Sequence, residues 1–116
     1  MNIFVLADSP KESAEMHCDK HVCKMMIEYA QMLSTAHRVL DGDEVISESL
    51  YKVAHKNHPC TIWTRTNRSN YLWLFRLWKN LSMEYTERYD RLHLSWTKLN
   101  LYLQFHPRNI PEGELT

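Results

Sequence analysis

Residues 70–91 read NYLWLFRLWKNLSMEYTERYDR, and this stretch decides the fold class. Its apolar side chains recur at helical spacing, but they cover more of the circumference than the narrow stripe of a surface helix. The stretch contains neither Gly nor Pro, the residues that most weaken a helix interior. We therefore predict a long central helix that touches several neighbouring helices, with Asn67 or Ser69 as its N-cap.

A second long helix is predicted nearer the amino end. The run Ser9-Pro10-Lys11-Glu12 places an N-cap serine before a first-turn proline and puts a glutamate at the third helical position, which is a capping box. Residues 12–40 contain no Gly or Pro, and their apolar residues recur every three or four positions. This pattern predicts an amphipathic helix, kinked near His17, that ends with Gly42 in a left-handed C-terminal position.

Shorter elements complete the expected fold. Asn57-His58-Pro59 forms a turn whose proline starts a helix through Thr66, and residues 95–105 predict a third packing helix. Residues 2–6 are β-branched and aromatic, so they form either a short strand or an extended segment, and residues 44–59 form a loop or short irregular helices. The sequence thus predicts a single domain over residues 1–116 with an all-α fold, a compact bundle of three to four main helices with a short N-terminal extended segment.

Composition and charge limit the function classes. The chain has 14 Lys and Arg against 14 Asp and Glu, whereas duplex-DNA binders usually carry a basic excess, so a DNA partner is disfavoured. Three cysteines without paired spacing indicate reduced thiols rather than a disulfide framework. No secretory signal and no run of about 20 apolar residues is present. We therefore expect a soluble, cytoplasmic protein with no membrane partner.

The first candidate site lies on the polar face of the helix predicted over residues 12–40. His17, Lys20, His21 and Lys24 follow one another as helical neighbours, and Glu28 lies one turn further on. Imidazole and ammonium groups donate to phosphate, so the four basic residues are predicted phosphate ligands and Glu28 a candidate catalytic carboxylate. The alternative is an ordinary solvated helix face. His17 and His21 could ligate zinc together with Cys18, Asp19 or a distant His, but the chain has neither the glutamate of a metalloprotease motif nor a Cys-x-x-Cys pair, so we expect no metal and no cofactor.

The second candidate site is the stretch YKVAHKNHP at residues 51–59. It concentrates hydrogen-bond donors ahead of a helix N-terminus, where backbone N–H groups also attract anions. The alternative is a positively charged surface loop in which Asn and Pro only shape the turn. The predicted phosphate ligands of this stretch are Lys52, His55, Lys56, Asn57 and His58.

The third candidate site lies at the end of the central helix. Glu84 is a second catalytic candidate and Arg88 a further phosphate ligand, although a pair at this spacing also stabilises a helix by itself. The aromatic residues exceed what a small core needs, and we predict that Trp63, Trp73 and Tyr89 stack on a base. The methionines are assigned to the core as gap-filling residues, namely Met16, Met25, Met26, Met32 and Met83.

Five motifs occur together in this chain: HCDKHVCKM at 17–25, STAHR at 34–38, HKNHP at 55–59, NYLWL at 70–74 and EYTERY at 84–89. They resemble a family of small tailed-bacteriophage proteins, from residue 1 to about residue 115. More distantly, the order of features is similar to the pyrimidine-dimer DNA glycosylase (phage endonuclease V-like) superfamily. Those features are a short N-terminal segment, a His/Arg-bearing first helix, an Asn-His-Pro turn and a long Glu-containing helix that ends near an aromatic-basic patch. This resemblance implies an all-α fold and a history of handling nucleotides.

The chain also departs from the phage endonuclease. That enzyme uses the α-amino group of its processed N-terminus as a nucleophile beside a helix glutamate. Here the bulky Asn2 should keep Met1 in place, because removal of the initiator methionine favours small second residues. Glu28 is the nearest matching carboxylate, but His and Lys replace the Arg-Glu pattern of that enzyme's first helix. These differences argue against an imine formed by the terminal amine.

Several hypotheses follow, and whether the protein is an enzyme stays open. The preferred one is a phage nucleotide-binding protein that sequesters a host cyclic or ADP-ribose-type nucleotide signal in anti-defence. A small-nucleotide binder that acts stoichiometrically is often a homo-oligomer with sites between subunits. The second is a DNA glycosylase or lyase acting on damaged or modified DNA, in which Glu28 or Glu84 activates a water molecule or another nucleophile. The third is a small-nucleotide hydrolase with histidines as acid and base, and the last is a structural interaction protein. The first and third require the donor clusters to meet in one pocket.

Overall fold

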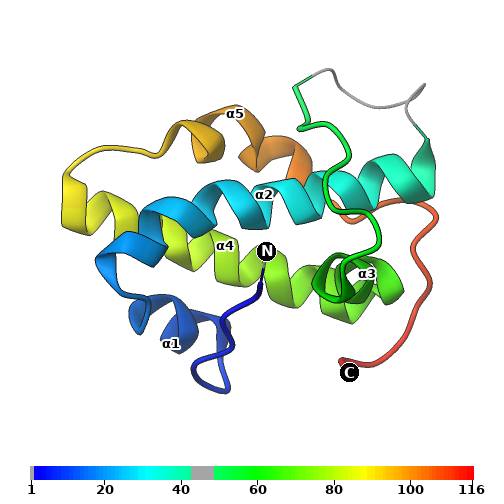
Figure 1. Cartoon of the computed structure of the whole chain (residues 1–116), viewed down its shortest axis with the longest axis horizontal. Coiled ribbons are helices and arrows are strands. Elements are labelled where there is room, and N and C mark those ends of the chain that lie inside the picture. The colour runs from blue at the N-terminus through cyan, green and yellow to red at the C-terminus, as the bar shows by residue number, and fades with distance from the viewer. Residues whose placement is uncertain (1, 43–48) are drawn as a thin grey trace.

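The computed structural model describes residues 2–42 and 49–116, and its elements are helices (Figure 1). They are α1 (Pro10–Glu15), α2 (Asp19–Asp41), α3 (Pro59–Thr66), α4 (Arg68–Tyr89) and α5 (Leu94–Leu103). Over these residues there is no strand, so residues 2–6 are extended without pairing and the predicted all-α bundle is confirmed. The predicted loop at 44–59 falls partly outside the described residues. None of the described helices has both the length and the apolar character that a bilayer span needs.

The predicted kink near His17 is a complete break between α1 and α2. Ser9 caps α1 as expected, its Oγ accepting from the Glu12 N–H at 3.1 Å. The chain then leaves the helix at Met16 and restarts at Asp19, with Cys18 as an extended N-cap. Arg88 of α4 donates to the carbonyl oxygen of His17, so the turn after α1 is completed by a residue distant in sequence.

Helix α4 is the centre of the bundle, as predicted. It packs against α1, α2, α3 and α5, and Asn67 caps its start, with the side-chain Oδ1 accepting from the Asn70 N–H at 2.8 Å. Trp78 of α4 is fully buried and donates its indole N–H to the carbonyl oxygen of Met26 on α2 at 2.9 Å. This hydrogen bond fixes the two longest helices against each other.

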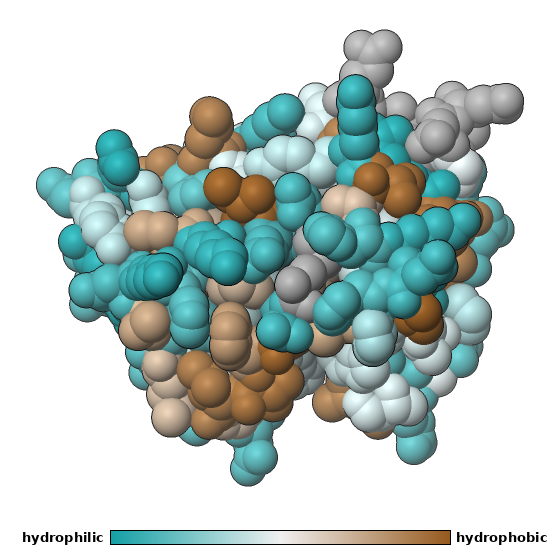
Figure 2. All heavy atoms as spheres, in the orientation of Figure 1, coloured by the Kyte–Doolittle hydropathy of each residue, from teal (hydrophilic) through white to brown (hydrophobic). Residues whose placement is uncertain are grey.

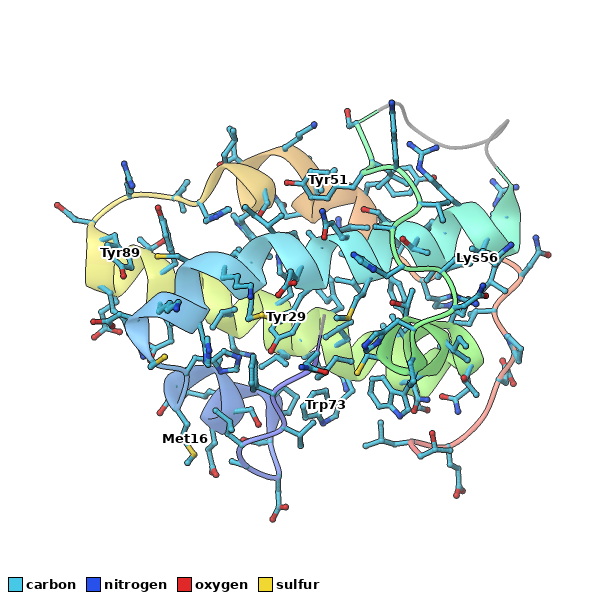
Figure 3. All side chains as sticks on the ribbon, in the orientation of Figure 1. Met16, Tyr29, Tyr51, Lys56, Trp73 and Tyr89 are labelled. Atoms are coloured by element: carbon cyan, nitrogen blue, oxygen red, sulfur yellow. The ribbon has the colours of Figure 1, made fainter. Side chains whose placement is uncertain are left out.

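The methionine assignments are correct for α2 and wrong elsewhere. Met25, Met26 and Met32 are at most 1% exposed. Met16 is 60% exposed because it stands in the break after α1, where its side chain points away from the bundle (Figure 3). Met83 is 55% exposed on the outer face of α4.

A C-terminal tail, residues 111–116, runs beside α3 and the start of α4 (Figure 1). Its backbone carbonyl oxygens accept hydrogen bonds from the side chains of Trp63 (3.0 Å) and Asn67 (2.9 Å) and from the backbone N–H of Arg68 (2.8 Å). Gly113 passes so close to Asn67 that an added Cβ would lie 3.0 Å from the Cβ of Asn67. The tail therefore fixes the orientation of the Trp63 ring.

Candidate functional site

The N-terminal extended segment, residues 2–6, is held against α2 by one hydroxyl group. The hydroxyl of Tyr29 accepts from the Phe4 backbone N–H at 3.0 Å and donates to Nε2 of His17 at 2.8 Å. His17 Nδ1 donates in turn to the carbonyl oxygen of Ser13 at 2.6 Å, which assigns Nε2 as the acceptor. Burial lowers the pKa of His17 and raises the pKa of Tyr29, so both groups stay neutral. His17 thus links α1, α2 and the N-terminal segment.

Side chains of the N-terminal segment alternate between two depressions, as an extended chain requires. Asn2 and Phe4 line a small cavity against α2, whereas Ile3 and Val5 line a larger groove against α3. The segment is therefore the wall between the two depressions.

The small cavity, which we call the Glu28 cavity, measures about 50 Å³. Besides the two side chains of the segment, it is lined by His21, Lys24, Met25 and Glu28 of α2. The Phe4 ring stacks on the His21 imidazole, with ring centroids 4.5 Å apart and planes 15° apart. The cavity thus combines a carboxylate, a primary amine and an imidazole on one helix face, which are three of the five residues of the first predicted cluster; His17 and Lys20 do not line it.

The larger depression, which we call the apolar groove, measures about 300 Å³ and is lined by Ile3, Val5, Pro59, Cys60 and Trp63. Figure 2 shows a hollow in this region, between the mass over α1 with the N-terminal segment and the mass over α3 with the C-terminus. The Trp63 ring meets Trp73 edge to face, with centroids 6.2 Å apart. Trp73 itself is only 8% exposed, so of the two predicted stacking residues on this side Trp63 is the one that lines the groove.

The three predicted donor clusters do not meet in these depressions. Lys56 of the second cluster and Tyr89 of the third lie at opposite ends of the long axis (Figure 3). The Glu28 cavity takes His21 and Lys24 from the first cluster, and neither depression is lined by a predicted donor of the second or third. The single phosphate pocket that the nucleotide-binding hypothesis requires is therefore not formed by these groups.

The second cluster forms the approach to α3. His58 is the N-cap of this helix, and its Nδ1 accepts from the Cys60 N–H at 3.1 Å. His55 adopts a left-handed backbone with φ of 47°. Lys52, Lys56 and Asn57 are exposed, so their predicted role as phosphate ligands stays a prediction.

The third cluster is tied to α1 and to the start of α2. The Arg88 guanidinium donates to the carbonyl oxygens of His17 (2.8 Å) and Glu15 (3.1 Å) and pairs with carboxylate oxygens of Asp19 (3.1 Å) and Glu84 (3.5 Å). These contacts give Arg88 and Glu84 a structural role. Tyr89 is 37% exposed, and its ring packs against Tyr85, with the two centroids 4.9 Å apart.

Sequence reasoning missed Tyr29 and Phe4. The helical pattern over residues 12–40 places Tyr29 only among its apolar residues, and Phe4 belongs to the segment predicted as a strand or extended chain. A buried tyrosine hydroxyl needs a partner, and this requirement was the signal available in the sequence. Over residues 2–42 and 49–116, no three His, Cys, Asp or Glu side chains are grouped so that they could hold a metal ion.

These features define a class of all-helical proteins in which an N-terminal segment forms one wall of a cavity that holds a carboxylate and an amine. Residues 1–97 match the family model described as pyrimidine dimer DNA glycosylase, so the chain belongs to this family. The matched residues include the N-terminal segment, both depressions and helices α1 to α4. No curated protein and no solved structure matches the chain. The expected similarity to this superfamily is confirmed, whereas the phage origin stays a prediction.

Proposed function

We propose that this protein is a DNA glycosylase that releases a damaged or modified base, with the Glu28 cavity as its active site. One observation carries the proposal: in a chain of this family, the carboxylate of Glu28 shares a cavity with the N-terminal segment. Glu84, the other predicted catalytic carboxylate, is paired with Arg88 and lies outside this cavity. Glu28 is therefore the proposed catalytic carboxylate.

Breaking a glycosidic bond places positive charge on the sugar ring, and a nearby carboxylate stabilises that charge. Glu28 is suited to this role because it is half-buried in a cavity with little room for water. A carboxylate also accepts the proton of an attacking nucleophile. Either role requires Glu28 to be ionised and in contact with the sugar.

The apolar groove supports the proposal because it lies on the other side of the same segment. Enzymes that act on a base extrude the target nucleotide from the DNA duplex and bind it between aromatic and apolar side chains. Ile3, Val5 and Trp63 offer such surfaces, and the Trp63 ring is fixed by its hydrogen bond to the C-terminal tail. The groove volume lies at the lower end of ordinary ligand pockets, roughly 300–1,000 Å³.

The neutral net charge is compatible with DNA only if cations are gathered locally. Lys20 and Lys24 are exposed on α2 beside the half-buried His21. Two to three phosphate contacts give a slope of about −2 to −3 for log Kobs against log salt concentration, less steep than for strongly basic DNA-binding proteins. We expect weak, salt-sensitive binding to undamaged duplex.

The test is base release from a labelled duplex that carries a single cyclobutane pyrimidine dimer, with a panel of duplexes carrying modified bases in parallel. Glu28→Gln should lower the release rate at least about 100-fold, in line with the loss of a catalytic carboxylate. Glu87→Gln, an exposed glutamate on α4, is the matched control and should stay within about twofold of the unmodified protein. Failure to release any base, or full activity of Glu28→Gln, would refute the proposal.

A further inference from the structure

A third depression lies at the carboxyl end of α2, and we call it the His37 pocket. Its volume is about 410 Å³, within the range of ordinary ligand pockets, roughly 300–1,000 Å³. The lining includes His37 and Asp41 of α2, Tyr102 of α5, and Phe105, His106 and Arg108 of the segment after α5. The last four of these lie beyond residue 97, where the family match ends. We propose that this pocket binds a nucleoside monophosphate.

The His37 pocket is separate from the site proposed for base release. It shares no lining residue with the Glu28 cavity or with the apolar groove. His37 lies nine residues after Glu28, which is roughly 13 Å further along the axis of α2. A ligand in the His37 pocket therefore does not occupy the place of the DNA sugar.

His37 forms the buried part of the lining, since only 3% of this residue is exposed. The Tyr71 hydroxyl donates to the carbonyl oxygen of Leu103 at 2.7 Å and accepts from Nε2 of His37 at 2.9 Å. The Tyr102 ring meets the imidazole edge to face, with centroids 5.1 Å apart. Two helices thus hold the imidazole in one orientation, and the buried side of the pocket is preformed.

Asp41 fixes the backbone at the mouth of the pocket. Its two carboxylate oxygens accept from the backbone N–H groups of Arg108 (2.8 Å) and Asn109 (2.9 Å). A carboxylate has about four acceptor positions, so further positions remain for a ligand. The Arg108 side chain is exposed, and over residues 2–42 and 49–116 no ion pair or hydrogen bond occupies its guanidinium group. The cation is therefore available while its backbone is anchored.

The groups at the mouth match the three parts of a nucleoside monophosphate. The guanidinium of Arg108 has the planar donor geometry that pairs with phosphate. Phe105 is 67% exposed, so its ring offers a face on which a base stacks. His106 donates from Nδ1 to the carbonyl oxygen of Pro107 at 2.8 Å, which leaves Nε2, like Asp41, as an acceptor for the amino group of a base. Inorganic phosphate would use the cation alone, and an uncharged nucleoside would use only the ring and the acceptors.

The test is isothermal titration calorimetry with 5′-AMP and 5′-CMP, beside adenosine and inorganic phosphate. We expect one nucleotide per chain with a Kd below about 1 mM, and binding at least about 10-fold weaker for adenosine and for phosphate. Backbone amide NMR spectra recorded during the titration should show shifts concentrated at residues 101–109. Absence of saturable binding by both nucleotides, or shifts concentrated at residues 21–28, would overturn the inference.

Variants of two exposed residues test the contacts. Arg108→Gln removes the cation and Phe105→Leu removes the ring, and each should weaken nucleotide binding at least about 10-fold. Arg76→Gln, an exposed arginine outside the pocket, is the matched control and should stay within about twofold. Unchanged affinity in both pocket variants would overturn the inference, and circular dichroism checks that their fold is unchanged. Base release should be unaffected in all three variants, so failure of this inference leaves the proposed glycosylase intact, and failure of base release leaves the nucleotide site intact.

Discussion

Replacing Tyr29 with phenylalanine removes one oxygen atom and tests how the N-terminal segment is held. Tyr29 is fully buried, and its hydroxyl is bonded both to the Phe4 N–H and to Nε2 of His17. Both partners lose their hydrogen bond in the variant. Leaving a buried polar group unpaired costs about 1–3 kcal/mol. The full cost applies to Nε2 of His17, because this side chain is only 2% exposed. The cost is smaller for the Phe4 amide, which is only partly buried and can bind water in the variant. We expect a total loss of about 2–4 kcal/mol in the free energy of unfolding.

The assay is thermal and urea denaturation of Tyr29→Phe beside a matched control, Tyr89→Phe. For a chain of this length 1 kcal/mol corresponds to roughly 3–5 °C, so the Tm of Tyr29→Phe should fall by about 6–20 °C. The Tyr89 hydroxyl contacts the carbonyl oxygen of Asp19 at 3.4 Å and the side chain of Cys23 in an exposed position, where water competes for both contacts, so its loss should change stability by less than about 0.5 kcal/mol. Equal and small effects for the two variants would refute the argument that the Tyr29 hydroxyl holds the segment. Hydrogen exchange at the Phe4 amide should rise in Tyr29→Phe and stay unchanged in Tyr89→Phe.

Three further predictions follow from buried contacts. Burial lowers the pKa of His37 to about 4, whereas the histidine of the unfolded chain binds a proton below about pH 6.5. The free energy of unfolding should therefore fall by up to about 3 kcal/mol between pH 6.5 and pH 4. Urea denaturation measures this profile, and a flat one would contradict the prediction. Arg88→Ala should cost about 2 kcal/mol and speed hydrogen exchange over residues 10–17, whereas Arg76→Ala, at an exposed position, should do neither. Trp78→Phe loses the bond to α2 and part of its core volume, so calorimetry should show a loss of about 2–3 kcal/mol; an unchanged Tm would exclude this hydrogen bond as a major contributor.

Most of the fold was predictable from the sequence because the helix signals are local. The Ser9 N-cap, the Asn67 N-cap and the helix that begins at Pro59 all lie where the sequence predicts them. The break between α1 and α2 was underestimated because no Gly or Pro marks it. It depends on burial of the His17 ring and on the Arg88 contacts, and both involve residues far apart in sequence.

The candidate site was predictable only in part. Helical spacing placed His21, Lys24 and Glu28 on one face of α2, and the structure brings them into one cavity. Spacing could not reveal that Phe4 covers this face, since the crossing of the N-terminal segment depends on a hydrogen bond to Tyr29. It also could not show that the second and third clusters face other regions, because their positions follow from helix packing.

In the C-terminal tail, the number of residues matters more than the identity of most side chains. The five side chains of residues 111–116 are exposed, and the tail is attached mainly through its backbone, with the Thr116 hydroxyl accepting from Nδ2 of Asn70 at 3.0 Å. The ion pair between Arg68 and Glu112 is solvent-exposed and contributes little. A saturation mutagenesis library should therefore accept most residues along the tail except at Thr116, whose hydroxyl binds Asn70, and at Gly113, where a side chain would crowd Asn67. A one-residue deletion, by contrast, would shift every carbonyl group out of register. For this part of the chain, a change in length should therefore be tolerated less well than a change of side chain.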